Sequence, residues 1–223
     1  MRLLSLPRLL GTLSLIAIPA ASHAQFTSYT TLASFLAATT NVGTDAFENL
    51  SITGLTPSPL NRTAGAFNYV ASVPSSNNFF GAGSIADKWL STSRATDAML
   101  FNGFAPGVRG VGGLIFGSDF AGAFLAGTSI RIDATRVGGA AFFTTLNNTT
   151  TSAFFGLVAT SDITSFTVTS VQPQTGFAWG TVNNFVLANG PATNVVPEPS
   201  TYLLMGTGLV GLVGVACRRR ANV

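Results

Sequence analysis

The chain has 223 residues and a net charge of +3; charged residues make up 9% of it and hydrophobic residues 47%. This composition is too apolar for an intrinsically disordered chain. Five of the eleven basic residues lie in the terminal segments, and between Gln25 and Val196 six bases stand against seven acids, which gives a net charge of −1. Because a near-neutral body displaces few counterions from phosphates, nucleic acid is not an expected partner.

The first 24 residues predict a cleavable signal peptide. Arg2 and Arg8 supply the positive start, and Leu9–Ala20 is an apolar run of the length found in signal peptides. Small residues precede the expected signal-peptidase site between Ala24 and Gln25. The alternative, an uncleaved membrane anchor, is disfavoured by the shortness of the apolar run.

The body begins with a predicted helix. Leu32, Phe35 and Leu36 recur at helical spacing, and Ser28 or Thr30 is the expected N-cap.

After this helix the apolar pattern changes to a period of two. In one segment Ile130 and Ile132 face one side while Arg131 and Asp133 face the other, as in a strand with one buried face. Several such strands, separated by Gly, Pro, Asn and Ser, predict an all-β fold, an antiparallel β-sandwich with a core of phenylalanines. The expected strands are Asp45–Leu50, Ala66–Val73, Ala98–Phe104, Val108–Phe116, Ser129–Val137, Ala140–Leu146, Ala153–Thr160, Ile163–Gln172 and Phe177–Leu187.

The body lacks the residues of the commonest catalytic centres. The whole chain has one histidine, His23, and one cysteine, Cys217, and both lie in the terminal segments outside the body. Nucleophilic catalysis of the Ser-His-Asp or Cys-His kind, zinc binding and disulfide bonds are therefore not expected in the body. We predict that the protein is not an enzyme.

Carboxylates leave two weaker alternatives. Asp45 and Glu48, three residues apart at the start of an expected strand, should point to opposite faces, and Asp119 and Asp133 are further candidates for a glycoside hydrolase. A structural calcium ion could take oxygen ligands from Asp45, Glu48, Asp133 and Asn184, but no ligand-dense loop is present, so solvated acids are the favoured interpretation.

Two tryptophans are tentative stacking platforms for sugar rings. Trp89 and Trp179 both follow small or polar neighbours, which leaves their burial undecided. A core role is the favoured alternative, because tryptophan is usually highly buried.

The C-terminal segment 197–223 combines three features in a fixed order. Pro197-Glu198-Pro199 precedes an apolar run, residues 201–217, and then Arg218-Arg219-Arg220. A helix of this length spans about 25 Å, slightly less than the hydrocarbon core of a bilayer, and three arginines should stop its translocation.

This arrangement resembles the PEP-CTERM sorting signal. The resemblance implies a Gram-negative bacterium with an exosortase that processes the tail, and members of this family often accompany genes for exopolysaccharide and biofilm matrix. The expected processing enzymes are therefore an exosortase and a signal peptidase. Before processing, the C-terminal helix should anchor the protein in the inner membrane.

The body also resembles the jelly-roll-like ectodomain of many PEP-CTERM proteins. The resemblance rests on the helical segment 30–36 before residues 45–50, on segments 154–157 and 163–166, and on the last expected strand. Where the last strand of the family carries an aspartate, this chain has Asn183-Asn184. This departure weakens the inference of an acidic site from the resemblance.

Three segments follow from these patterns: a signal peptide at 1–24, a β-sandwich ectodomain at 25–196 and a sorting tail at 197–223. The predicted function is an exported surface or matrix protein, structural or adhesive, in contact with extracellular polysaccharide. The alternatives are a calcium-dependent carbohydrate-binding module and, less favoured, a glycoside hydrolase.

Overall fold

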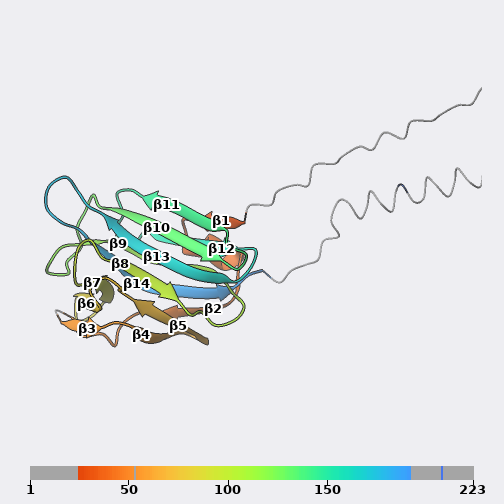
Figure 1. Ribbon diagram of the computed structural model, residues 1–223, viewed down its shortest axis with the longest axis horizontal. Coiled ribbons are helices and arrows are strands. Elements are labelled where there is room, and N and C mark those ends of the chain that lie inside the picture. Colours follow the sequence, from red (N-terminus) through yellow and green to blue (C-terminus); the bar gives the residue numbers. More distant parts are fainter. Residues whose placement is uncertain (1–24, 53, 192–206, 208–223) are drawn as a thin grey trace, which may run out of the picture.

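A computed structural model describes residues 25–52, 54–191 and 207, and nearly all of its regular structure is β-strand (Figure 1). The predicted signal peptide, the motif Pro197–Pro199, the cluster Arg218–Arg220 and, apart from Thr207, the predicted membrane segment lie outside the described residues. Within the described part, no helix is long and apolar enough to cross a bilayer.

The strands form two antiparallel sheets, here called the large and the small sheet. The large sheet has the order β1 (Phe26–Tyr29), β12 (Phe154–Ala159), β9 (Val108–Ser118), β14 (Trp179–Asn189), β7 (Lys88–Thr92), β6 (Asn78–Gly83) and β3 (Leu55–Pro57), and β2 (Thr40–Asp45) also pairs with β14. The small sheet has the order β11 (Ala141–Leu146), β10 (Ser129–Arg136), β13 (Ile163–Val171), β8 (Ala98–Asn102), β5 (Phe67–Ser72) and β4 (Leu60–Ala64).

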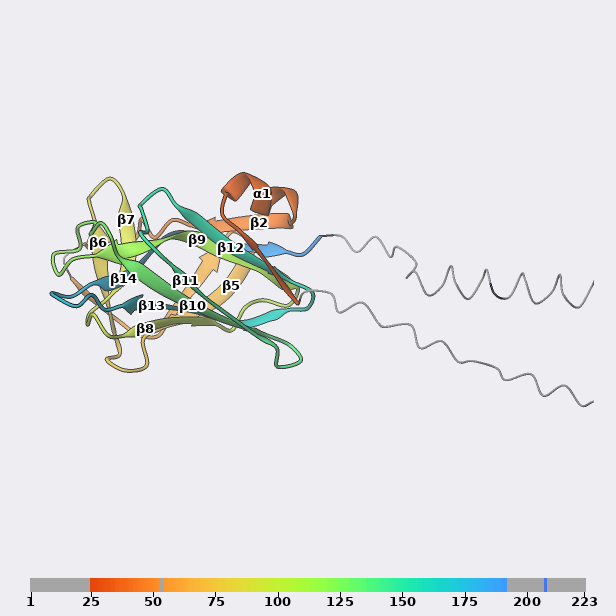
Figure 2. The ribbon, with the colours of Figure 1, turned by 90° about the horizontal axis from the view of Figure 1, so that it is seen from above.

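The two sheets pack face to face around one core (Figures 1 and 2). Phe185 of β14 stacks on Phe101 of β8 with ring centroids 4.3 Å apart, and it also contacts Phe166 of β13 at 6.1 Å. All three rings are fully buried. This layering agrees with the predicted antiparallel sandwich, while the finer jelly-roll-like assignment stays a prediction.

Helix α1 (Leu32–Ala37) covers part of the outer face of the large sheet (Figure 2). Its Phe35 is fully buried and packs in a second cluster with Phe154 of β12 and Val186 of β14. The predicted helix is therefore present, but its N-cap is Thr31, whose side chain accepts a hydrogen bond from the Ser34 N–H. Ser28, one of the expected caps, lies in β1 instead.

Eight of the nine expected strands are present, with ends within two residues of the prediction. The expected strand Asp45–Leu50 is wrong, because β2 ends at Asp45. Phe47 adopts a left-handed backbone conformation with φ of +60°, and the Leu50 N–H donates to the Phe47 carbonyl, so the chain turns at this point. Strands β1, β2, β3, β4, β6 and β7 were not predicted.

Strand β14 contains a bulge at Asn183 and Asn184. Between Asn183 and Val186, β14 contains one residue more than the segment of β9 that pairs with it. Within this bulge, Asn184 has a φ of +48°. Asparagine tolerates this left-handed conformation better than most residues. The bulge lies where β14 changes neighbours: its first half pairs with β7 and its second half with β2.

Candidate functional site

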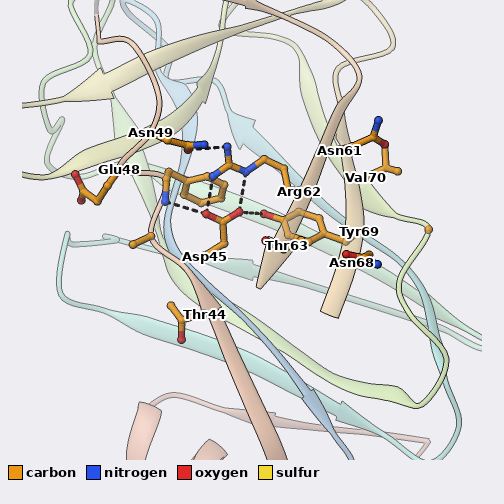
Figure 3. A pocket seen from close by; sticks show the side chains of 13 residues that line it. Thr44, Asp45, Glu48, Asn49, Asn61, Arg62, Thr63, Asn68, Tyr69 and Val70 are labelled. Carbon is orange, nitrogen blue, oxygen red and sulfur yellow. Dashed lines mark hydrogen bonds and ion pairs between the residues drawn. The ribbon is translucent and has the colours of Figure 1, made fainter. Parts of the chain in front are cut away.

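A hollow of about 670 Å³ lies beside the end of β2, the turn that follows it and the hairpin of β4 and β5 (Figure 3). Its volume lies within the range of small-molecule binding sites. The polar residues that line it are Thr44, Asp45, Glu48, Asn49, Asn61, Arg62, Thr63, Asn68 and Tyr69.

The floor of the hollow is a buried carboxylate with four hydrogen-bond donors. Oδ1 of Asp45 accepts from the Phe47 N–H at 3.0 Å and from Arg62 Nη2 at 2.6 Å. Oδ2 accepts from Arg62 Nε and from the Tyr69 hydroxyl, both at 2.7 Å. Asp45 is 7% exposed, and both of its oxygens are fully occupied by these bonds.

The hairpin of β4 and β5 places both side-chain donors on the same face. Arg62 and Tyr69 are directly opposite each other in the antiparallel register, so their side chains project together toward Asp45. β2 approaches this hairpin closely at Gly43, where a Cβ atom would collide with the Ala64 carbonyl. A glycine at this position therefore allows the end of β2 to lie within reach of the pair.

Electrostatics keep Tyr69 and Arg62, the two side-chain donors of this network, protonated. Burial, followed by the charge of Asp45, raises the pKa of the Tyr69 phenol well above its usual range, so the hydroxyl remains a donor. Burial by itself lowers the pKa of Arg62, but the hydrogen bond and charge of Asp45 outweigh it, and the pKa of Arg62 lies above its ordinary value. Arg62 and Tyr69 therefore both act as hydrogen-bond donors to Asp45.

The network also holds the turn at the rim. Arg62 Nη1 donates to Asn49 Oδ1 at 2.9 Å, and its guanidinium lies 5.0 Å from the ring centroid of Phe47. Glu48 is exposed, and its carbonyl accepts from Lys88 Nζ at 2.7 Å. Strand β7 therefore contacts the turn from the other side.

Two amides remain available on the rim. Asn61 and Asn68 are exposed, and neither side chain has a hydrogen-bond partner among the described residues. Each amide can donate two hydrogen bonds and accept further ones. Because side chains alternate along a strand, Asn61 and Asn68 project from the face of the hairpin opposite to that of Arg62 and Tyr69 (Figure 3).

The carboxylates named in the sequence analysis have separate structural partners. Asp133 pairs with Arg131 on β10, in the small sheet, and Asp119 accepts hydrogen bonds from the Ala121 and Ala123 N–H groups of its own loop. Of the four calcium candidates, Asp45 and Glu48 line the hollow, whereas Asp133 and Asn184 lie on other strands. Within the described residues, no group of three or more His, Cys, Asp or Glu could hold a metal ion.

Neither tryptophan lines the hollow. Trp89 is half-buried on β7, with its ring edge-on to Phe116 at 4.8 Å between centroids. Trp179 is half-buried at the start of β14, and Phe177 beside it, at 6.4 Å, is 65% exposed. A stacking role for the tryptophans stays a prediction, and Trp179 has the more open surroundings.

The N-terminal cleavage site also stays a prediction, because Ala24 lies outside the described residues. Gln25 is the first described residue, and its carbonyl accepts a hydrogen bond from the Thr160 N–H at 3.2 Å.

A comparison with family models identifies the C-terminal segment. The model described as the PEP-CTERM protein-sorting motif matches residues 195–220, which include Pro197–Pro199 and Arg218–Arg220. The chain carries a PEP-CTERM sorting motif. This motif implies an exported protein of a Gram-negative bacterium that is sorted and processed by an exosortase.

The match covers the sorting motif and not the hollow. No curated protein sequence and no solved structure matches the chain.

Proposed function

We propose that the protein is a non-enzymatic component of an extracellular polysaccharide matrix, which it contacts through the hollow beside Asp45. The observation that carries this proposal is the pair of free amides, Asn61 and Asn68, on the exposed face of a hairpin whose other face holds the buried ion pair. The adhesive role rests on binding at this place and requires no catalytic group.

The chemistry of the hollow suits neutral sugars. Hydroxyl groups of a sugar both donate and accept hydrogen bonds, and amides and threonine hydroxyls complement both functions. The charges of Asp45 and Arg62 neutralise each other, so the base of the hollow has no excess charge to attract an ionic ligand. The sorting motif supports the location, because it implies an exported protein, and the polysaccharide of a matrix lies outside the cell.

Binding to polysaccharide extracted from the producing cells tests the hollow directly. We expect Asn61→Ala together with Asn68→Ala to weaken binding about tenfold or more, since each lost hydrogen bond contributes about 0.5–1.5 kcal/mol. Gln174→Ala is the matched control, because Gln174 is an exposed amide in the loop before β14 and does not line the hollow.

Two further measurements distinguish the proposed hollow from binding at Trp179 and from calcium-dependent binding. If Trp179→Ala abolishes binding and the double asparagine variant does not, the ligand lies on the tryptophan and the proposed hollow is wrong. If a chelator abolishes binding by the wild type, the calcium-dependent module replaces the present proposal. Unchanged binding in all variants contradicts a role for the hollow.

The tail has its own test, in which Pro197, Glu198 and Pro199 are all replaced by alanine. The apolar run and the arginines remain, so membrane insertion should persist, while processing and delivery to the surface should fail in a host with an exosortase. Proline on both sides of the glutamate favours an extended segment that a protease can bind as a strand. Cleavage and release of the variant equal to those of the wild type would contradict sorting through the motif.

A further inference from the structure

Four strands end the two sheet orders, and a fifth strand, β2, pairs with β14 alone among the described strands and lies against β4. Three of the four end strands are protected against pairing with another chain. β1 has four residues, and β3 has three, one of which is Pro57. β4 follows Pro59, and β2 lies against it at the contact of Gly43 with Ala64. Short length, proline and cover are the usual means by which proteins block a free sheet edge.

The fourth edge strand, β11, has none of these protections. Its six residues, Ala141–Leu146, include two phenylalanines and two threonines but no charge, proline or glycine. It pairs with β10 over its whole length, and among the described residues no strand pairs with its other side. Its backbone groups on that side form a row suited to hydrogen-bonding with another strand.

A second indication of a partner comes from the outer row of β11, which is the set of alternate residues that point away from the core. Phe143 is 75% exposed, and its ring lies on the outer face of the sheet, 6.0 Å from the guanidinium of Arg131. On the inner row, Phe142 is half-buried and packs on Phe26 and Phe155 in the core. A strand added beside β11 would place side chains within contact distance of Phe143.

We propose that β11 pairs antiparallel with β11 of a second copy of this chain, which joins two small sheets into one continuous sheet. The partner is a second copy because the strand is self-complementary. A two-fold axis perpendicular to the sheet sets outer residues opposite outer residues, and because β11 carries no charged residue, no like charges face each other. The body of the chain, with a net charge of −1, adds little repulsion.

Such a pair has a defined register. Because side chains alternate between faces, a one-residue slip would bring the outer row of one copy opposite the inner row of the other. One residue of β11 must therefore face itself across the two-fold axis, and the offset along the strands between equivalent residues must increase by about 7 Å for each step away from it.

A cysteine scan of the full chain on intact cells tests this geometry. Cys217 is replaced by Ser, which leaves no native cysteine, and single cysteines are then introduced at each of the six positions of β11. Mild oxidation should cross-link one position, or two neighbouring ones, into a dimer, and the yield should decrease on both sides. Ser28→Cys is the matched control, since Ser28 is exposed on the edge strand β1, and it should remain monomeric.

A charge substitution tests the same contact without cysteine. Thr145→Lys adds a charge to the exposed outer row of β11 and should reduce dimer cross-linking at the best position at least tenfold. Thr175→Lys, in an exposed loop, should leave it unchanged, and equal circular dichroism spectra show that each variant is folded. The inference is overturned if β11 gives no dimer, if yields do not depend on position, if Ser28→Cys cross-links equally, or if Thr145→Lys has no effect.

Discussion

Two arginine–aspartate pairs of this protein have the same geometry in opposite surroundings. Arg62 and Asp45 form two hydrogen bonds, of 2.7 and 2.6 Å, and Arg131 and Asp133 form the equivalent two, of 2.8 and 2.7 Å. In each pair the arginine also lies over a phenylalanine ring. Their side chains are 9% and 7% exposed in the first pair and 55% and 38% exposed in the second.

The comparison shows that geometry alone does not measure the importance of an ion pair. On the surface, water replaces either partner, and side-chain entropy opposes the contact. In the interior, removal of one partner leaves a charge that nothing solvates. The buried pair should therefore be essential to its region, while the exposed pair should be dispensable.

The largest effect is expected from Arg62→Ala. The variant leaves the Asp45 carboxylate buried without its cation, which should lower the free energy of unfolding by about 3–5 kcal/mol. Urea unfolding followed by tryptophan fluorescence measures this change. Arg62→Lys should restore part of the stability, because it keeps the charge but loses the two-pronged contact. A loss below about 1 kcal/mol in Arg62→Ala would remove the distinction between the two pairs.

A smaller effect, with its own pH dependence, is expected from Tyr69→Phe. At neutral pH the lost hydrogen bond to a charged acceptor should lower stability by about 1.5–3 kcal/mol. The folded-state pKa of Tyr69 is raised, so its contribution is complete below the unfolded pKa of about 10 and is lost as pH rises toward the folded value.

The wild type should therefore lose about 1.4 kcal/mol of stability per pH unit above about pH 10 from this group, and Tyr69→Phe should lack that loss. Unfolding in urea at neutral pH and at two alkaline pH values compares the two proteins. Parallel pH profiles would show that Tyr69 titrates equally in the folded and unfolded states.

The smallest effect is expected from Arg131→Ala and from Asp133→Ala. Neither variant should change the melting temperature measurably, and a double-mutant cycle of the two positions should give no coupling, in contrast to the equivalent cycle at Arg62 and Asp45. Addition of salt should leave this result unchanged. Coupling as strong as that of the buried pair would show that shared geometry, rather than burial, decides the contribution.

The sequence predicted the strands that alternate clearly and missed those that do not. Residues 129–136 and 163–171 show period-two patterns with one apolar face, and both strands are present. β6 contains two glycines, and β4 contains Asn61 and Arg62, so neither has an apolar row to reveal it. These strands are specified by the neighbours that they pair with, which a local pattern does not record.

The candidate site was predictable in part. Asp45 and Glu48 were recognised as close in sequence, but the strand expected to carry them ends at Asp45, and the two were given the wrong local structure. Arg62 and Tyr69 were not predicted at the site, because their proximity to Asp45 depends on the register of β4 and β5. The available signal was the alternation of Phe67, Tyr69 and Ala71, which places the Tyr69 side chain on the buried face.

The position of β14 determines how the body responds to mechanical load. β14 is the last strand before the sorting motif, and it is flanked by β9 on one side and by β7 and β2 on the other. A force transmitted along the chain from residues 195–220 reaches the body near the end of this strand, and its component along the strand pulls on the ladders of β14. Because ladder hydrogen bonds lie perpendicular to the strands, this pull shears many bonds at once instead of opening them singly. The hydrogen bonds to β9, β7 and β2 would therefore oppose an axial pull on β14 together.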